Sequence, residues 1–187
     1  MHKRRLLLTI GTVVAVGIIG ISFYIRTKEK SLSPERKAKF DGNDLSLYVQ
    51  YSAPYKKGRK IFGGLVPYGK LWRTGANEAT VFATENTINI NGQEIPSGRY
   101  HLITIPQPDH WTVILNSDIP GWGIDIESGV TYHNPKEDVL AVDVPVESQP
   151  IAEQFNISFE KMASGASLVF KWDDVRVAVP VTRSVKE

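Results

Sequence analysis

The chain has 187 residues, of which 42 % are hydrophobic and 22 % are charged; its formal net charge is +2 and it contains no cysteine. This length and composition suit one globular domain and exclude a largely disordered chain. A net charge this small indicates no broad basic face, so we expect no nucleic-acid partner, and without cysteine the chain forms neither disulfides nor thiolate metal sites.

The N-terminal segment is predicted to span a membrane. Residues 6–25 carry no charge and, at about twenty residues, are long enough to cross roughly 30 Å of hydrocarbon. The basic residues 2–5 (HKRR) precede this segment, as is typical of exported chains. A cleaved signal peptide is the alternative, but the segment is longer than a signal core of about 7–15 residues, and no clear A-x-A cleavage site follows. We therefore predict an uncleaved single-pass anchor at residues 1–25.

The charges that flank this segment bear on the side of the membrane that the main domain occupies. Positive residues after the segment outnumber those before it, which by the positive-inside rule places the domain in the cytoplasm. A short N-terminal tail with a basic cluster is instead typical of a signal anchor, and we expect an extracytoplasmic domain at the cell membrane. Residues 26–39 are polar and interrupted by Pro34, so we predict a tether on or near the lipid headgroups.

From residue 45 onward the hydrophobic pattern is that of β-strands. Apolar residues alternate with polar ones from Leu45 to Tyr51, and Asn91-Gly92 predicts a hairpin turn because both residues tolerate positive φ. No amphipathic helix of three turns is evident beyond the membrane segment. We predict a single all-β domain at residues 40–183, a β-sandwich or partly closed barrel, with a tail at residues 184–187. The predicted strands are residues 45–51, 81–83, 88–90, 93–95, 99–105, 111–115, 139–146, 154–159, 167–172 and 176–181, with a tight turn at 171–175.

Two long motifs lie between the first predicted strands. They are residues 58–69, GRKIFGGLVPYG, and residues 72–80, WRTGANEAT, and three shorter motifs follow at residues 98–100, 105–106 and 111–114. In this order they resemble a family of uncharacterised bacterial proteins, catalogued as domain of unknown function 2911. The resemblance covers most of the chain beyond the tether. It implies an extracytoplasmic bacterial β-domain behind an N-terminal export signal, and it implies no activity.

The segment at residues 57–80 contains more polar residues and glycines than a connection between two strands requires, and we predict a ligand site there. Arg73 offers a rigid fork of donors that suits a carboxylate or phosphate. Asn77 supplies a donor and an acceptor, and Glu78 can accept a hydroxyl or serve as a base. The structural alternative is an internal pair between Arg73 and Glu78 with an Asx-type turn at Asn77.

Three further residues are assigned to the same site. Lys57 and Arg59 flank a flexible glycine, in a turn that resembles an anion-binding turn but lacks the helix that phosphate-binding loops need. A solvated loop is the alternative for this turn. Trp122 lies between two glycines that cannot cover it, so its indole is predicted either to form a wall of the site, as a platform for sugar rings, or to fold back on the core.

Two classes of function remain open from the sequence. We favour a non-catalytic binding or interaction module with a polar small-molecule or glycan ligand. The alternative is an envelope hydrolase or metal-dependent enzyme that uses Glu78 as acid or base and Arg73 as an electrostatic clamp. His101, His110 and His133 can in principle converge on a zinc ion with Glu78 or Asp109, but their wide spacing favours chance placement, so we predict no metal site and no cofactor.

Overall fold

The computed structural model describes residues 17, 20, 31–125 and 127–184, and the chain divides into two compact units, Met1–Leu32 and Ser33–Glu187. Apart from two glycines, the predicted membrane segment at residues 6–25 lies outside the described residues. Where the structure describes the chain, it contains no helix with the length and apolar character needed to cross a bilayer.

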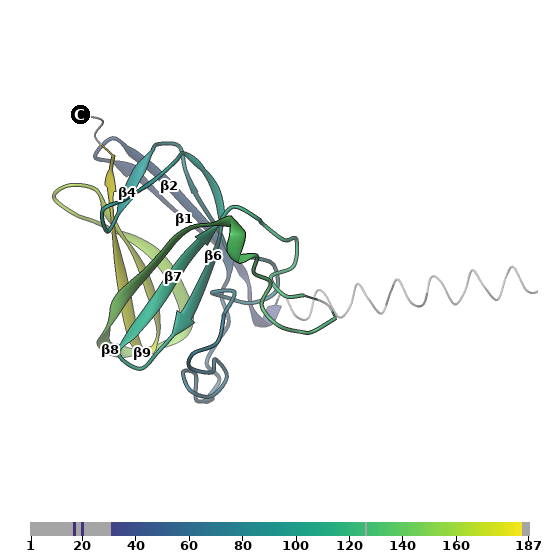
Figure 1. Cartoon of the computed structure of the whole chain (residues 1–187). Helices are drawn as coiled ribbons and strands as arrows, with labels where there is room; N and C mark the ends of the chain where they lie inside the picture. Colours follow the sequence, from purple (N-terminus) through teal and green to yellow (C-terminus); the bar gives the residue numbers. More distant parts are fainter. Residues whose placement is uncertain (1–16, 18–19, 21–30, 126, 185–187) are drawn as a thin grey trace, which may run out of the picture. The chain divides into compact units, whose positions relative to one another are not determined.

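The second unit is an all-β domain, as predicted. Its strands form one antiparallel sheet in the order β1-β2-β3-β6-β7-β8-β9-β4-β5 (Figure 1). Hydrogen bonding links every neighbouring pair in this order, and the predicted division into a sandwich stays a prediction. The elements are β1 (Glu35–Gly42), β2 (Leu45–Ser52), β3 (Val81–Thr84), β4 (Ile88–Ile90), β5 (Gln93–Ile95), β6 (Gly98–Pro106), β7 (His110–Asn116), the 3-10 turn η1 (Pro135–Glu137), β8 (Asp138–Lys161) and β9 (Ala166–Arg183).

Strand β1 includes residues that the sequence assigns to the tether. Residues 35–39 form its first part, and β1 pairs with β2 in an antiparallel register that runs from Glu35↔Ser52 to Gly42↔Leu45. Its hydrophobic alternation is weak because only Ala38 and Phe40 pack against the core. A strand is difficult to recognise from its sequence when nearly every residue in it is polar, which explains why the sequence pattern did not reveal β1.

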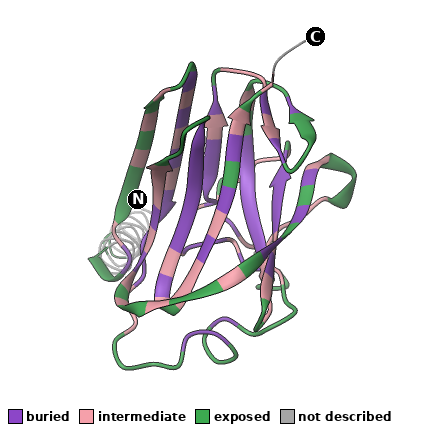
Figure 2. Ribbon diagram, turned by 90° about the vertical axis from the view of Figure 1, so that its left-hand side faces the viewer, coloured by how far each residue is buried: buried purple, intermediate pink, exposed green. Residues whose placement is uncertain are grey.

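The hydrophobic core lies on one face of the sheet (Figure 2). The core residues come from early strands such as β2 and from late strands such as β8 and β9, so these strands share a single core. The hydroxyl of Tyr51 on β2 accepts a hydrogen bond of 2.9 Å from the backbone N–H of Ile157 on β8, which joins these two strands directly. The largest fully buried side chains are Trp111, Trp172, Phe82, Phe155, Phe170 and Leu47.

Strands β8 and β9 are longer than predicted, with 24 and 18 residues, and the predicted tight turn at residues 171–175 is wrong. The chain continues through this region as a strand, and the β8–β9 pair carries a bulge there with the extra residues on β8. Asp173 has a φ of 54°, and the register of the β8–β9 pair shifts on either side of Ala152. The pattern of core residues changes parity at the bulge, from Leu168, Phe170 and Trp172 to Val177, Val179 and Val181.

This change of parity has a direct physical cause. Successive side chains of a strand point to opposite faces, so an extra residue at a bulge moves every later side chain to the other face unless the hydrophobic pattern shifts as well. The polar residues Asp173 and Asp174 occupy the shift, and a polar interruption between two alternating stretches has the same appearance in sequence as a turn.

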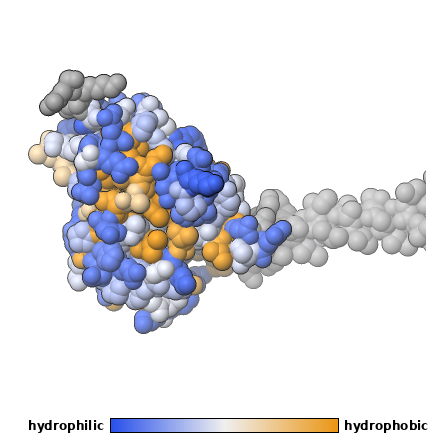
Figure 3. Space-filling view, viewed as in Figure 1, coloured by the Kyte–Doolittle hydropathy of each residue, from blue (hydrophilic) through white to orange (hydrophobic). Residues whose placement is uncertain are grey.

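The surface of the domain is mostly polar. Figure 3 shows apolar residues in the middle of one face, with polar residues around them. Large apolar side chains that are exposed occur on separate elements, such as Leu65 and Tyr68 in the 57–80 segment, Ile151 on β8 and Met162 in the β8–β9 turn. Isolated exposed apolar residues are normal in globular domains, so none of these alone marks a binding surface.

The β8–β9 turn supplies a test of this fold. A Cβ added at Gly165 would lie 2.1 Å from the carbonyl oxygen of Val181, and Gly165 has a φ of 103°. We expect Gly165→Ala to lower the free energy of unfolding by about 3 kcal/mol or more, because backbone strain and a steric clash act together. Gly92→Ala is the matched control, since Gly92 also has positive φ but nothing lies within 4 Å of its added Cβ. Urea denaturation of both variants should therefore show a clearly larger loss at Gly165, and equal losses would contradict the described turn.

Candidate functional site

The 57–80 segment is anchored to the core by two aromatic side chains. The ring centroid of Phe62 lies 5.1 Å from that of Trp111. The ring of Trp72 lies 4.9 Å from Phe155 and stacks on Trp172 at 5.9 Å. Aromatic pairs of this kind each contribute about 0.5–1.5 kcal/mol beyond the burial of their area. The polar residues of this segment are therefore carried on a backbone that is fixed to the interior of the domain.

The backbone of residues 72–80 follows the edge of β6. Trp72 and Thr104 exchange two backbone hydrogen bonds of 2.8 and 2.9 Å, and the N–H of Leu102 donates to the carbonyl of Thr80 at 2.8 Å. The chain thus leaves the position next to β6 after Trp72 and returns to it at Thr80, where β3 begins. The residues between these two points bulge away from the strand and can present side chains to a ligand.

This bulge contains an unusual backbone conformation. Thr74 has a φ of 53° and Asn77 a φ of 58°, and positive φ is costly for a β-branched residue such as threonine. Buried hydrogen bonds hold it in place, since the hydroxyl of Thr80 donates to the carbonyl of Thr74 at 2.8 Å and the hydroxyls of Thr74 and Thr104 lie 3.1 Å apart. Conformations of this kind cost of order 1–3 kcal/mol and are concentrated at binding and catalytic sites.

A second segment, distant in sequence, lies against this bulge. Glu78 pairs with Trp122 in an isolated antiparallel bridge, and the N–H of Gly123 donates to the carbonyl of Asn77 at 3.3 Å. A Cβ added at Gly123 would lie 2.9 Å from Cδ of Arg73, so the arginine side chain passes directly over this glycine. We call Arg73, Asn77, Glu78 and Trp122 the Arg73 cluster. The structure therefore brings together four of the six residues that the sequence assigns to the site.

The members of the Arg73 cluster differ in exposure. Arg73, Glu78 and Trp122 are partly exposed, whereas Asn77 is buried and its amide donates to the carbonyl of Ser33 at 3.4 Å. The hydroxyl of Ser52 lies 3.4 Å from Oε2 of Glu78. Arg73 and Glu78 both also interact with other groups of the protein. The cluster thus combines side chains that are held in position with polar groups and an indole that solvent can reach.

The other two predicted residues, Lys57 and Arg59, lie at a different corner. Both are exposed, and the backbone N–H of Lys57 donates to the carboxylate of Glu153 on β8 at 2.7 Å. The guanidinium of Arg59 binds the backbone carbonyls of Tyr55 and Lys56. The described contacts of Lys57 and Arg59 are therefore with their own turn and with β8. The role of this turn in binding an anion stays a prediction.

The sequence analysis considered His101 of β6 as a metal ligand but did not predict its burial. His101 is fully buried, and neither ring nitrogen has a hydrogen-bond partner among the residues that the structure describes. Burial, and to a lesser extent the nearby His133, lower its pKa to about 4, and Asp118 opposes this shift. It points to the face of the sheet opposite the core, where the alternation of β6 predicts solvent. The irregular segment between β7 and β8, which contributes Asp118 and His133, covers that face, and no sequence pattern revealed this cover.

The histidines do not support the predicted enzymatic alternative. His133 lies 2.9 Å from the carboxylate of Asp138, and His110 lies 2.8 Å from that of Asp109. Within the described residues, no group of three histidine, aspartate or glutamate side chains is placed to hold a metal ion. The described acid partners of His110 and His133 are thus Asp109 and Asp138, not Glu78.

Comparison with known proteins identifies the family of the chain. A family model described as a protein of unknown function (DUF2911) matches residues 33–181, which is most of the chain, so the chain belongs to this family, as its motifs predicted. No curated protein and no solved structure matches it. Since the family name carries no activity, the function has to be derived from the site.

The close packing of Gly123 under Arg73 can be tested. We expect Gly123→Ala to lower the free energy of unfolding by about 1–3 kcal/mol, because the new Cβ must displace either the arginine side chain or the backbone at Ala79. Gly121→Ala is the control, as its added Cβ meets nothing within 4 Å, and it should change stability by less than about 0.5 kcal/mol. Chemical denaturation measures both, and indistinguishable values would show that the two segments do not pack as described.

Stability should depend on pH through His101. Its pKa in the folded protein is about 4, below the ordinary value of 6.5, so the unfolded chain binds more protons between these values. The free energy of unfolding should therefore fall as the pH is lowered from about 6.5 to about 4, by up to about 3 kcal/mol. His101→Leu should reduce this dependence, whereas His110→Gln, at a partly exposed ring, should retain it. Identical pH profiles for His101→Leu and the unmodified chain would contradict the buried neutral imidazole.

Proposed function

We propose that this member of the DUF2911 family is a non-catalytic binding module whose ligand site is the Arg73 cluster. The observation that carries this proposal is the backbone pairing of Glu78 with Trp122. This pairing brings a charged, glycine-rich segment next to a partly exposed indole that comes much later in the chain, after β7. A connection that served only to link β2 with β3 would need neither the indole nor the strained backbone at Thr74 and Asn77.

The chemistry of the cluster suits a polar small molecule or a glycan. The guanidinium of Arg73 can donate paired hydrogen bonds, and the carboxylate of Glu78 can accept hydrogen bonds from hydroxyl groups. The indole of Trp122 offers an apolar face on which a sugar ring can stack. Sugar recognition in proteins combines these same elements, a planar aromatic face and polar groups that bind hydroxyls, which supports a glycan over an apolar ligand.

We also infer that the domain is held at the cell membrane on the extracytoplasmic side by residues 6–25, and that its folded sheet is a sandwich around the common core. The absence of charge and the length of residues 6–25 support the anchor, and the basic residues 2–5 support export of the domain. The shared core of β2 and β8 supports the sandwich. A ligand site on such a domain would meet molecules of the cell envelope.

A ligand screen with matched variants tests the proposed site. The full-length chain in detergent would be screened against neutral sugars and polar small molecules by thermal shift, and hits would be confirmed by tryptophan fluorescence. Trp72, Trp111 and Trp172 are buried, so a ligand at the cluster should chiefly change the emission of Trp122. We expect Arg73→Lys and Trp122→Phe each to weaken binding at least about tenfold, which corresponds to the loss of about one charge-assisted hydrogen bond or stacking contact.

Arg59→Lys is the control for this screen, because Arg59 lies at the other corner and should leave the affinity unchanged. A loss of binding with Arg59→Lys but not with Arg73→Lys would place the site at the turn of Lys57 and Arg59 and contradict the proposal. It would also be contradicted if Arg73→Ala and Glu78→Gln each destabilised the chain by roughly 3–5 kcal/mol, since that is the behaviour of a buried structural pair.

A further inference from the structure

A second candidate site lies on the face of β1, β2, β3 and β6 that points away from the core. Lys39 of β1 is directly opposite Tyr48 of β2, Tyr48 is opposite Ala83 of β3, and Ala83 is opposite Arg99 of β6. Cross-strand neighbours point to the same face of a sheet, so these four side chains form one row across it. None of them belongs to the site proposed above, and the inference does not depend on that proposal.

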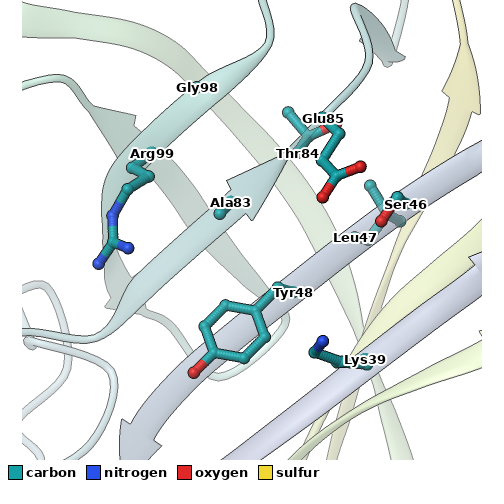
Figure 4. Close-up of a pocket in the computed structure, with 9 residues that line it drawn as sticks. All are labelled: Lys39, Ser46, Leu47, Tyr48, Ala83, Thr84, Glu85, Gly98 and Arg99. Carbon is teal, nitrogen blue, oxygen red and sulfur yellow. The ribbon is translucent and has the colours of Figure 1, made fainter.

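The small side chain of Ala83 leaves a hollow in this row. Figure 4 shows Ala83 between Arg99 and the ring of Tyr48, with Glu85 just beyond the end of β3. The hollow has a volume of about 390 Å³, and Ser46, Leu47, Thr84 and Gly98 also line it. Two strand spacings separate Tyr48 from Arg99, which is about 10 Å. A six-membered ring fits this gap, with Ala83 below it.

The charges around the hollow are available to a ligand. Within residues 31–125 and 127–184, the guanidinium of Arg99 and the carboxylate of Glu85 have no hydrogen bond or ion pair to another side chain, and both residues are exposed. The ammonium of Lys39 lies 6.0 Å from the ring centroid of Tyr48, at the limit of a cation–π contact. Isolated exposed charges are usually only solvated, but these three surround an aromatic ring and a hollow.

We propose that this hollow binds a carboxylated sugar. The carboxylate of the ligand is held by the fork of Arg99, which matches its geometry, and the sugar ring lies over Ala83 against the side chain of Tyr48. Lys39 adds a second positive charge beside the ring. Glu85 and Ser46, at the other end of the hollow, bind hydroxyl groups of the ligand.

This distribution of charge distinguishes a sugar acid from other anions. An aromatic carboxylate has no hydroxyl groups to offer Glu85 and would place an apolar edge against its charge. Inorganic phosphate would use the cations but neither the hollow nor Tyr48. A neutral sugar would leave both cations without a partner. Only a ligand with a carboxylate at one end and hydroxyls at the other uses every group of the hollow.

The experiment is a calorimetric titration of the full-length chain in detergent with D-glucuronate as the probe. D-glucose, benzoate and inorganic phosphate serve as comparison probes. We expect saturable binding of glucuronate, and binding at least about tenfold weaker for each of the other three. Absence of saturable glucuronate binding, or equal binding of glucose, benzoate or phosphate, would overturn the proposal.

Variants assign the binding to the hollow. Arg99→Gln removes the carboxylate partner and Ala83→Leu fills the hollow, so each should weaken glucuronate binding at least about tenfold without a change in melting temperature. Lys37→Gln is the matched control on the same face of β1, where Lys37 pairs with Glu35 at 3.6 Å, and should bind like the unmodified chain. Trp122→Phe should also bind normally. An equal loss in Lys37→Gln, or a loss in Trp122→Phe alone, would overturn the assignment.

Discussion

The insertion of Trp72 and Phe62 into the core is the interaction on which the rest of the candidate site depends. These two rings pack among Trp111, Phe155 and Trp172, which come from three different strands. They convert what would be a long surface connection into part of the interior. Because Trp72 is fixed, Arg73 must leave the core at a defined point, and the bulge that follows must fit between Trp72 and Thr80. Hydrophobic packing thus sets the position of the site, and buried hydrogen bonds such as that from Thr80 to the carbonyl of Thr74 hold the bulge in its conformation.

A second constraint is the long pairing of β8 with β9. Each strand crosses the domain with an irregularity in its middle, and Asp173 at the irregularity of β9 forms a half-buried ion pair with Lys56. This ion pair links Asp173 of β9 to the start of the 57–80 segment. The segment is therefore held at two points by different forces, the ion pair of Lys56 just before its start and the aromatic packing of Trp72. The exposed turn at Lys57 and Arg59 lies between these two points.

The sequence predicted the local structure well where one face of a strand is apolar, as in β2, or where a turn needs positive φ, as at Asn91 and Gly92. It failed at β1, where almost every residue is polar, and at Asp173, where a bulge and a turn have the same polar signature. It assigned Arg73, Asn77, Glu78 and Trp122 to one candidate site together with Lys57 and Arg59, and their role in binding stays a prediction. The proximity of the first four, the cover over His101 and the hollow at Ala83 depend on which strands become neighbours, and local patterns carry no such information.

The place of β9 in the sheet affects how the chain can be made. Strand β4 pairs with β5 and with the last residues of β9, Thr182 and Arg183, while β3, which precedes it in the chain, lies among other strands. During synthesis the β4–β5 hairpin therefore emerges before β9, and β4 has no second neighbour until the end of β9 has left the ribosome. Until then the hairpin's apolar side chains Ile88, Ile90 and Ile95 have no finished core to cover them. Non-local pairing of this kind slows folding and exposes strand edges, so the nascent domain has a period of vulnerability to aggregation that ends only with its final strand.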